Sequence, residues 1–218
     1  MNLIDKISEQ FSNKSFIVGR ERYINSGVLI PIIIKDGSEF ILFQKRSQSV
    51  RQPGEVSFPG GHFDQSLDPD YLSTAVRETS EELGIGTEKI NVLGKLGTLV
   101  APMGVIVEAY IGILYIDSLN ELEIDKKEVE KIFLIPLKYF IENNPDEYYT
   151  NIEIHPFTTD ENGHRVDHFP VKELGLPEMY SIPWRKGKHR VLIYKTDEET
   201  IWGITAELIY ELSNKLKD

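Results

Sequence analysis

The sequence predicts an α/β (α+β) fold in which helices pack around a mixed β-sheet. Three observations carry this prediction: β-branched apolar runs recur along the chain, one long segment has a helical apolar period, and the chain ends in a second helical pattern. The 218 residues are enough to bury a full core, and we find no repeat or flexible linker. One enlarged domain over residues 1–218 is therefore the simplest organisation.

The first elements follow from short patterns. An amphipathic helix is expected over about residues 1–12, where apolar residues recur on one side. Ser26–Ile34 and Phe40–Gln44 are apolar runs on either side of Asp36-Gly37, and this arrangement is typical of a β-hairpin.

A second helix is expected from Pro69 to Leu83. At 100° per residue, Leu72, Val76 and Leu83 share one face, and three glutamates lie on the opposite face. Gly84 is a natural stop for this helix.

The rest of the chain predicts further strands and helices around a polar excursion at about 147–183. Helices are expected at Pro136–Glu142 and at about 205–216. The expected strands are Asn91–Leu96, Val105–Tyr115, Ile132–Ile135, Val191–Tyr194 and Thr200–Trp202.

Composition limits the classes of partner and compartment. The net charge of −11 would repel nucleic acid and anionic membranes, so we expect neither as a partner. The apolar stretch Val28–Ile34 is too short to cross a bilayer, and the first residues lack the apolar region of a signal peptide. Cysteine is absent, which excludes disulfides and thiol chemistry. A cytoplasmic protein is the default expectation.

The glutamates of the second helix are the first candidates for chemistry. Glu78, Glu81 and Glu82 would repel one another on one exposed face, and a divalent cation would turn that repulsion into attraction. A solvated acidic face is the simpler explanation for such a run standing alone. Here Gly60-Gly61 comes shortly before the helix, and paired glycines allow a backbone to approach a metal or phosphate closely.

Gly60-Gly61 followed by Arg77-Glu78-Thr79-Ser80-Glu81-Glu82-Leu83-Gly84-Ile85 resembles the Nudix box. The resemblance implies a Nudix-like α/β/α sandwich around a mixed sheet, with the box as a loop–helix–loop at about 60–85. It also implies that Glu78, Glu81 and Glu82 bind Mg²⁺, or Mn²⁺ in its place, and that Arg77 braces them. Glu81 or Glu82 would serve as the base, and the sequence does not divide these roles.

Two departures from the box concern its first half. The spacer between the glycines and Arg77 is longer than usual, and the glutamate expected early in it is absent. Asp64, Asp68 and Asp70 are the nearby acids, and the sequence leaves open which of them substitutes.

A second signature resembles the coenzyme A pyrophosphatases. It runs from Leu42-Phe43-Gln44-Lys45-Arg46-Ser47 through Arg51 to Pro53-Gly54-Glu55-Val56-Ser57-Phe58-Pro59-Gly60-Gly61. Ile201-Trp202-Gly203-Ile204-Thr205-Ala206 is similar to the C-terminal segment of the same group. The interval between Arg51 and Gly54 is one residue shorter than usual.

The resemblance implies hydrolysis of coenzyme A to 4′-phosphopantetheine and adenosine 3′,5′-bisphosphate. Lys45, Arg46 and Arg51, together with Gly60 and Gly61, would bind this anionic substrate. ADP-ribose or a dinucleoside polyphosphate is an alternative substrate, and a non-catalytic nucleotide sensor is an alternative class. The three retained glutamates favour an enzyme.

Three smaller expectations remain. Glu128 is a candidate for a further acid from a later loop, although a surface charge is the simpler explanation. The basic run Arg185–Arg190 reads as a hairpin turn that exposes charge, or as a cap on a substrate phosphate. A homodimer is plausible from family habit, and the segment 147–183 is a candidate lid.

Overall fold

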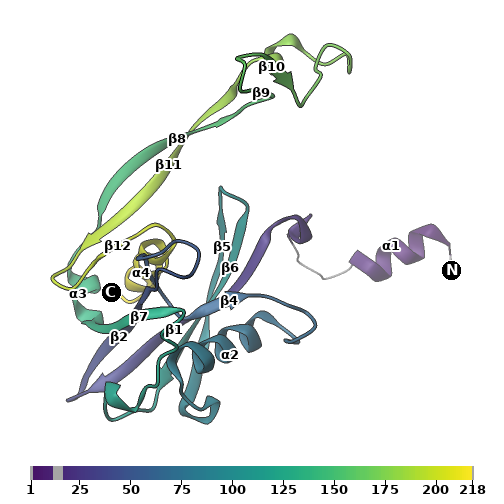
Figure 1. Ribbon diagram of the computed structural model, residues 1–218. Helices are drawn as coiled ribbons and strands as arrows, with labels where there is room; N and C mark the ends of the chain where they lie inside the picture. The colour runs from purple at the N-terminus through teal and green to yellow at the C-terminus, as the bar shows by residue number, and fades with distance from the viewer. Residues whose placement is uncertain (1, 12–16, 218) are drawn as a thin grey trace. The chain divides into compact units, whose positions relative to one another are not determined.

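The computed structural model describes residues 2–11 and 17–217, and the side chains of residues 10, 11, 185 and 186 fall outside this description. The chain divides into two compact units, residues 1–136 and 137–218. The first unit carries a mixed sheet and the Glu-rich helix, and the second carries a long two-stranded ribbon (Figure 1). Whether the chain is one domain, as the sequence suggests, stays a prediction.

The first unit is built on a seven-stranded sheet. Its helices are α1 (Leu3–Phe11) and α2 (Tyr71–Leu83), with short 3-10 turns η1 (Arg20–Arg22), η2 (Thr87–Lys89) and η3 (Leu119–Glu121). Its strands are β1 (Ile24–Lys35), β2 (Ser38–Arg46), β3 (Val56–Ser57), β4 (Gly60–His62), β5 (Ile90–Ala101), β6 (Val105–Leu114) and β7 (Val129–Pro136).

The sheet mixes parallel and antiparallel pairs. Its main order is β3-β2-β1-β6-β5, with β4 added beside β1 and β7 beside β2. The β1–β6 pair is parallel, and the other pairs are antiparallel. The predicted mixed α+β fold around a mixed sheet is confirmed.

The β1–β2 hairpin forms where the sequence predicts it. Lys35 pairs with Ser38, and Asp36 and Gly37 between them both have positive φ, 52° and 74°. Two successive positive φ values define a type I′ turn, whose twist matches that of the flanking strands. The Asp-Gly pair is suited to this turn, because glycine meets no steric penalty there.

Helix α2 carries its own start and stop signals. The Asp70 side chain accepts a hydrogen bond from the Ser73 backbone N–H at 2.8 Å and so caps the first turn. Gly84 ends the helix in the left-handed region at φ 61°, as predicted. The buried face of the helix includes Ala75 and Leu83, which pack in a core with Leu29 of β1.

Gly27 sets the depth at which α2 lies on the sheet. A Cβ at this position would collide with the backbone carbonyl of Tyr71 and would crowd Ala75. Gly27 pairs with Gly61 of β4 on one side and with Glu108 of β6 on the other. The glycines of the box, the helix and the central strands therefore meet at one place.

The second unit combines a helix pair with the ribbon. It contains α3 (Leu137–Glu142), β8 (Asp146–Ile154), β9 (Phe157–Thr159), β10 (Arg165–Asp167), η4 (Glu178–Ser181), β11 (Trp184–Lys195), β12 (Thr200–Trp202) and α4 (Gly203–Lys215). Phe140 of α3 packs edge-on against Tyr194 of β11, with ring centroids 5.1 Å apart. Helix α4 contacts β11, β12 and α3.

In the second unit the turn expected at 185–190 needs correction, and the polar excursion at about 147–183 gains a defined start. The segment 147–183 is regular at its start, because β8 pairs with β11 along almost its whole length (Figure 1). The basic run 185–190 is also not a turn: Lys188, His189 and Arg190 pair with β8 inside β11. The polar composition conceals β8, which is exposed on both faces and has no apolar period, and it conceals the first half of β11, where 185–190 lacks apolar residues; only Val191–Tyr194 of β11 carries the pattern of a strand.

Neither terminal helix nor any other helix of residues 2–11 and 17–217 is long and apolar enough to cross a membrane. Helix α1 is amphipathic, and its residues Leu3, Ile4 and Ile7 are exposed. Residues 1 and 12 of the helix expected at about 1–12 lie outside the described ranges.

Candidate metal and pyrophosphate site

Arg77 is the centre of the ion pairs at the Glu-rich helix. Its Nη1 lies 2.9 Å from Oε2 of Glu81, and its Nη2 lies 2.9 Å from Oε1 of Glu78. Its Nε and Nη2 also donate to the buried carboxylate of Asp68, at 3.0 and 2.9 Å. One guanidinium therefore holds three carboxylates in place, which matches the bracing role that the box implies for it.

The three aspartates of the long spacer have three different partners. Asp64 accepts hydrogen bonds from the backbone and hydroxyl of Ser66, which fixes the loop. Asp70 is the helix cap described above. Asp68 alone reaches Arg77, and the Thr74 hydroxyl donates to it at 2.9 Å. Hydrogen bonds from Arg77, opposed by burial and aided by Thr74, lower the pKa of Asp68.

The structure thus brings Asp68 to the place where the sequence left a choice. A signal for it was present: Asp70 stands three residues before Ser73, a capping spacing, and Asp64 stands two before Ser66, a turn spacing. With Asp70 assigned to the helix cap and Asp64 to a turn, Asp68 is the aspartate left to contact Arg77.

Glu82 lies deeper than the other two glutamates, with 4% of its surface exposed. Its Oε2 accepts hydrogen bonds from Nε2 of Gln44 at 2.9 Å and from the Gly60 backbone N–H at 3.0 Å. Both donors are neutral. Burial raises the pKa of Glu82 to about 7, since these two hydrogen bonds offset it only in part and Glu78 and Glu128 repel the charge.

Glu78 and Glu128 extend the same acidic cluster. Burial raises the pKa of Glu78 above its usual value, against the pull of Arg77, and the charges of Glu81 and Glu128 raise it further. Glu128 is held by its backbone, whose carbonyl accepts from the Ser47 N–H at 2.8 Å. Repulsion from Glu128 also raises the pKa of both Glu78 and Glu82, and its role as a further acid stays a prediction.

The donor set fits a divalent cation. Glu78 and Glu82 are largely buried carboxylates, and the Glu82 carboxylate is bonded to neutral donors while two other acids repel it. Among residues 2–11 and 17–217, no three acidic or histidine side chains converge as a ready-made metal cage. Magnesium suits such a site, because it is usually held by one or two carboxylates, waters and substrate phosphates.

The paired glycines are required by close packing at the box. A Cβ on Gly61 would collide with the Glu78 carboxylate, and a Cβ on Gly60 would lie 2.5 Å from the Gly27 carbonyl oxygen. Gly60 also has φ 153°, which disfavours other residues. The Gly60 N–H is thereby free to reach Glu82.

The three basic residues proposed for substrate differ in their contacts. The Arg46 Nε donates to the Arg51 backbone carbonyl at 2.9 Å, so this side chain fastens the loop before the box. Lys45 lies 3.9 Å from Glu130 in a loose ion pair. Arg51 is exposed. Their role in binding substrate stays a prediction.

The basic run in β11 contributes a structural arginine. Arg190 pairs with Glu207 of α4 and lies 5.0 Å from the Tyr210 ring, which stabilises the second unit. Lys188 lies 5.8 Å from the Tyr149 ring. The side chains of Arg185 and Lys186 lie outside the described residues.

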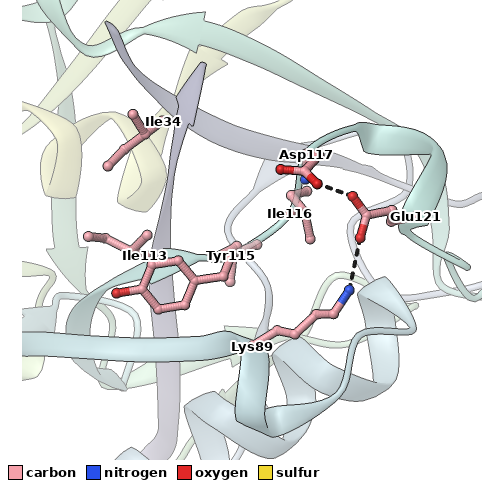
Figure 2. Close-up of a pocket in the computed structure, with 8 residues that line it drawn as sticks. Ile34, Lys89, Ile113, Tyr115, Ile116, Asp117 and Glu121 are labelled. Atoms are coloured by element: carbon pink, nitrogen blue, oxygen red, sulfur yellow. Dashed lines mark hydrogen bonds and ion pairs between the residues drawn. The ribbon is translucent and has the colours of Figure 1, made fainter. Parts of the chain in front are cut away.

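A shallow cavity of about 310 Å³ lies elsewhere in the first unit (Figure 2). Ile34 and Ile113 line it from the distal ends of β1 and β6, and Lys89 closes one side through a 2.8 Å ion pair with Glu121. Gly27 and Glu108, beside the box, lie at the other ends of these strands. The cavity is therefore distinct from the glutamate cluster.

Glu108 is a third deeply buried carboxylate, in addition to Asp68 and Glu82, and the sequence analysis missed it. It is 2% exposed and lies 2.5 Å from Nη2 of Arg20 in an ion pair. Lys95 forms a second ion pair with it, and the Thr98 hydroxyl donates at 2.8 Å. Burial would raise its pKa, but the bonds to Lys95, Thr98 and Arg20 outweigh burial and lower it.

The family model for the NUDIX domain matches residues 25–154, which include the box and its sheet. The chain belongs to the NUDIX family. The predicted recognition of a Nudix hydrolase is confirmed, and with it the general expectation of an enzyme of this class. The bond that this Nudix hydrolase cleaves and its substrate are matters for proposal.

Relatives of this Nudix hydrolase include two proteins named as coenzyme A diphosphatases. The mouse peroxisomal coenzyme A diphosphatase NUDT7 is 33% identical over 152 residues, which is 68% of this chain and 62% of that protein. The human mitochondrial coenzyme A diphosphatase NUDT8 is 33% identical over 59% of this chain and 55% of its own length. The match thus spans about three fifths of these relatives.

A bacterial relative aligns over a greater length. The uncharacterized Nudix hydrolase NudL of Photorhabdus laumondii is 28% identical over 88% of this chain and 85% of its own. Among solved structures, a MutT/nudix family protein from Enterococcus faecalis covers 99% of this chain and 70% of its own, at 11% identity and a TM-score of 0.48. A C. elegans Ap4A hydrolase complex covers 55% of this chain and 84% of its own, with 21% identity and a TM-score of 0.44.

Proposed function

We propose that this Nudix hydrolase cleaves the pyrophosphate bond of coenzyme A or a derivative, giving 4′-phosphopantetheine and adenosine 3′,5′-bisphosphate. The single observation that carries the chemistry is the buried, uncompensated carboxylate of Glu82 beside Glu78. The Arg46–Gly61 signature and the two relatives named as coenzyme A diphosphatases support the choice of substrate.

Mg²⁺, with Mn²⁺ as a substitute, is the proposed cofactor. When bound, it would neutralise pyrophosphate oxygens and lower the pKa of a water molecule. Glu78 and Glu82 are the proposed ligands, because Glu82 is buried, Glu78 is half-buried, and both lie in one acidic cluster. Glu128 would add negative charge to the same place.

The remaining residues bind, orient and accept protons. Glu81 is 59% exposed, so it can reach solvent and take a proton from the attacking water, or act as a further ligand. Arg77 and Asp68 hold Glu78 and Glu81 in position. Gly60 and Gly61 let the backbone come close to the phosphates, and Lys45, Arg46 and Arg51 would contribute positive charge to them.

The test compares the purified protein with its Glu82→Gln variant. Each is incubated with coenzyme A, ADP-ribose or diadenosine polyphosphates, with Mg²⁺ or with EDTA, and the products are separated by chromatography. We expect metal-dependent release of adenosine 3′,5′-bisphosphate from coenzyme A, which is lost in the variant.

Other outcomes would change the proposal in defined ways. Cleavage of ADP-ribose or diadenosine polyphosphate alone would keep the metal-assisted mechanism and reject coenzyme A. Tight binding of one nucleotide without turnover of any would instead support a nucleotide sensor. A dimer, a lid role for 147–183 and a cytoplasmic location remain predictions that this assay leaves open.

A further inference from the structure

Gln44 is a buried polar residue in an apolar stretch of β2. It follows Ile41–Phe43, all fully buried, and is itself 1% exposed. Its backbone position is paired on both sides, with Ser57 of β3 and with Ile132 of β7. The side chain therefore projects from a fixed point inside the sheet, and a rigid strand is a precise support for a neighbouring group.

The side chain of Gln44 is directed at Glu82, 38 residues further along the chain. Its Nε2 donates to Oε2 of Glu82 at 2.9 Å, and only a longer 3.4 Å contact joins it to the Ser57 hydroxyl. An ionised carboxylate only accepts hydrogen bonds, so it requires the amide nitrogen on this side. The amide oxygen Oε1 of Gln44 is left buried and accepts no hydrogen bond from the described residues.

The two donors to Glu82 share one oxygen. Gln44 and the Gly60 N–H both bond Oε2, and Oε1 accepts no hydrogen bond from the residues that the structure describes. With Oε2 fixed at two points, the carboxylate cannot rotate freely, and Oε1 is the oxygen left for a cation. Gln44 is the side-chain member of this pair, so it can be removed by substitution.

We propose that Gln44 is a positioning residue, which fixes the Glu82 carboxylate so that one defined oxygen faces a divalent cation. This inference rests on the metal site of the proposed function. The competing explanation is that Gln44 only satisfies a buried carboxylate and so stabilises the fold. The two differ in what they predict for metal affinity, because hydrogen-bond partners of metal ligands typically contribute 10–100-fold to it.

The test is calorimetric titration of Mn²⁺ alone into the full-length protein and its Gln44→Met variant. Methionine keeps the length of the side chain and lacks the donor. We expect the dissociation constant for Mn²⁺ to rise by about 10-fold or more. In turnover assays, kcat at limiting Mn²⁺ should fall and recover as Mn²⁺ is raised, while KM for the nucleotide stays unchanged.

Thr98→Val is the matched control. It removes one neutral donor from Glu108, which is as buried as Glu82 but lies two strands from Gly61 in the sheet. We expect this variant to lose thermal stability to a similar extent and to keep its Mn²⁺ affinity within about twofold, since the Thr98 hydroxyl bonds Glu108 and not a proposed metal ligand.

The outcomes separate this inference from the proposed function. Wild-type Mn²⁺ affinity in Gln44→Met, with binding abolished in Glu82→Gln, would overturn the role of Gln44 and keep the metal site. Unchanged Mn²⁺ binding in Glu82→Gln would overturn both. If Gln44→Met does not fold, the side-chain amide signals of Gln44 in the wild type decide: a shift on Mg²⁺ titration supports the inference, and no shift rejects it.

Discussion

Glu82 and Glu108 are buried almost equally, with 4% and 2% of their surfaces exposed, but their surroundings are opposite. Glu108 has two cations, Arg20 and Lys95, and its pKa is lowered. Glu82 has two neutral donors and two acidic neighbours, and its pKa is raised to about 7. A buried carboxylate with its own cations is complete within the fold. One without them has a raised pKa, and a cation from outside would favour its ionised form.

Asp68 is an intermediate case. It is 3% exposed and is compensated by Arg77, yet the same guanidinium also holds Glu78 and Glu81. The charge of Asp68 is therefore compensated within the fold, as is that of Glu108. Its partner Arg77, however, also holds two glutamates of the proposed metal site. Among these three carboxylates, the one without a cation of its own is the one proposed to bind the metal.

The largest difference is expected in activity. Glu82→Gln should lower kcat by about 10³-fold, because losing a metal ligand removes several kcal/mol of transition-state stabilisation. Glu108→Gln should leave kcat within about threefold of wild type, since its partners lie outside the cluster. Steady-state assays with saturating Mg²⁺ measure both. An equal loss in the two variants would mean that charge compensation does not separate function from structure.

The two carboxylates should also give opposite pH dependences of stability. The pKa of Glu82 is raised from 4.5 to about 7 in the folded state, so the metal-free protein loses roughly 3 kcal/mol of unfolding free energy as pH rises between these values. The pKa of Glu108 is lowered, so its contribution is present above pH 4.5 and is lost as pH falls through its folded pKa.

Urea denaturation in EDTA across this pH range measures the slopes. In Glu82→Gln most of the loss between pH 4.5 and 7 should disappear, leaving the part that comes from the raised pKa of Glu78, and in Glu108→Gln the whole loss should persist. Added Mg²⁺ should flatten the wild-type slope, because the cation compensates the charge. A wild-type slope of the opposite sign would contradict the raised pKa.

At neutral pH the free energy of unfolding should respond in the opposite way to activity: Glu108→Gln should lower it, and Glu82→Gln should not. Glu108→Gln should lower the free energy of unfolding by about 2 kcal/mol. Breaking a fully buried ion pair costs about 3–5 kcal/mol, and the loss is smaller here because Lys95 and Arg20 reach solvent. Glu82→Gln should lose no stability in EDTA at pH 8, where it removes an uncompensated charge. Chemical denaturation of both variants under identical conditions tests this. Destabilisation by Glu82→Gln would show that its charge is already compensated.

The smallest effect is expected at Asp68. Asp68→Asn keeps the shape of the side chain and weakens its hold on Arg77, so kcat should fall on the order of 10-fold through the loosened Glu78 and Glu81. Asp64→Asn, in the same loop but with its side chain hydrogen-bonded to Ser66, is the control and should keep wild-type activity. If both variants are equally active, Asp68 is a structural acid only.

Local patterns were sufficient for much of the fold. The Asp36-Gly37 turn, the helix over Tyr71–Leu83 and its stop at Gly84 each depend on backbone preferences of a few consecutive residues. The ribbon β8–β11 could not be read in this way, because β8 is exposed on both faces, residues 185–190 of β11 are polar, and the two strands pair across about forty residues. The basic run 185–190 was misassigned to a turn for the same reason.

The sequence by itself determined the hairpin, the capped helix and the spacing of the box, because each is a local pattern. Only the tertiary structure decided that Glu82 is buried without a cation, that Asp68 is the acid on Arg77, and that Glu108 meets Arg20. These facts depend on residues brought together from different strands and loops. Burial and charge compensation are properties of what surrounds a side chain, and the order of residues along the chain does not state what that will be.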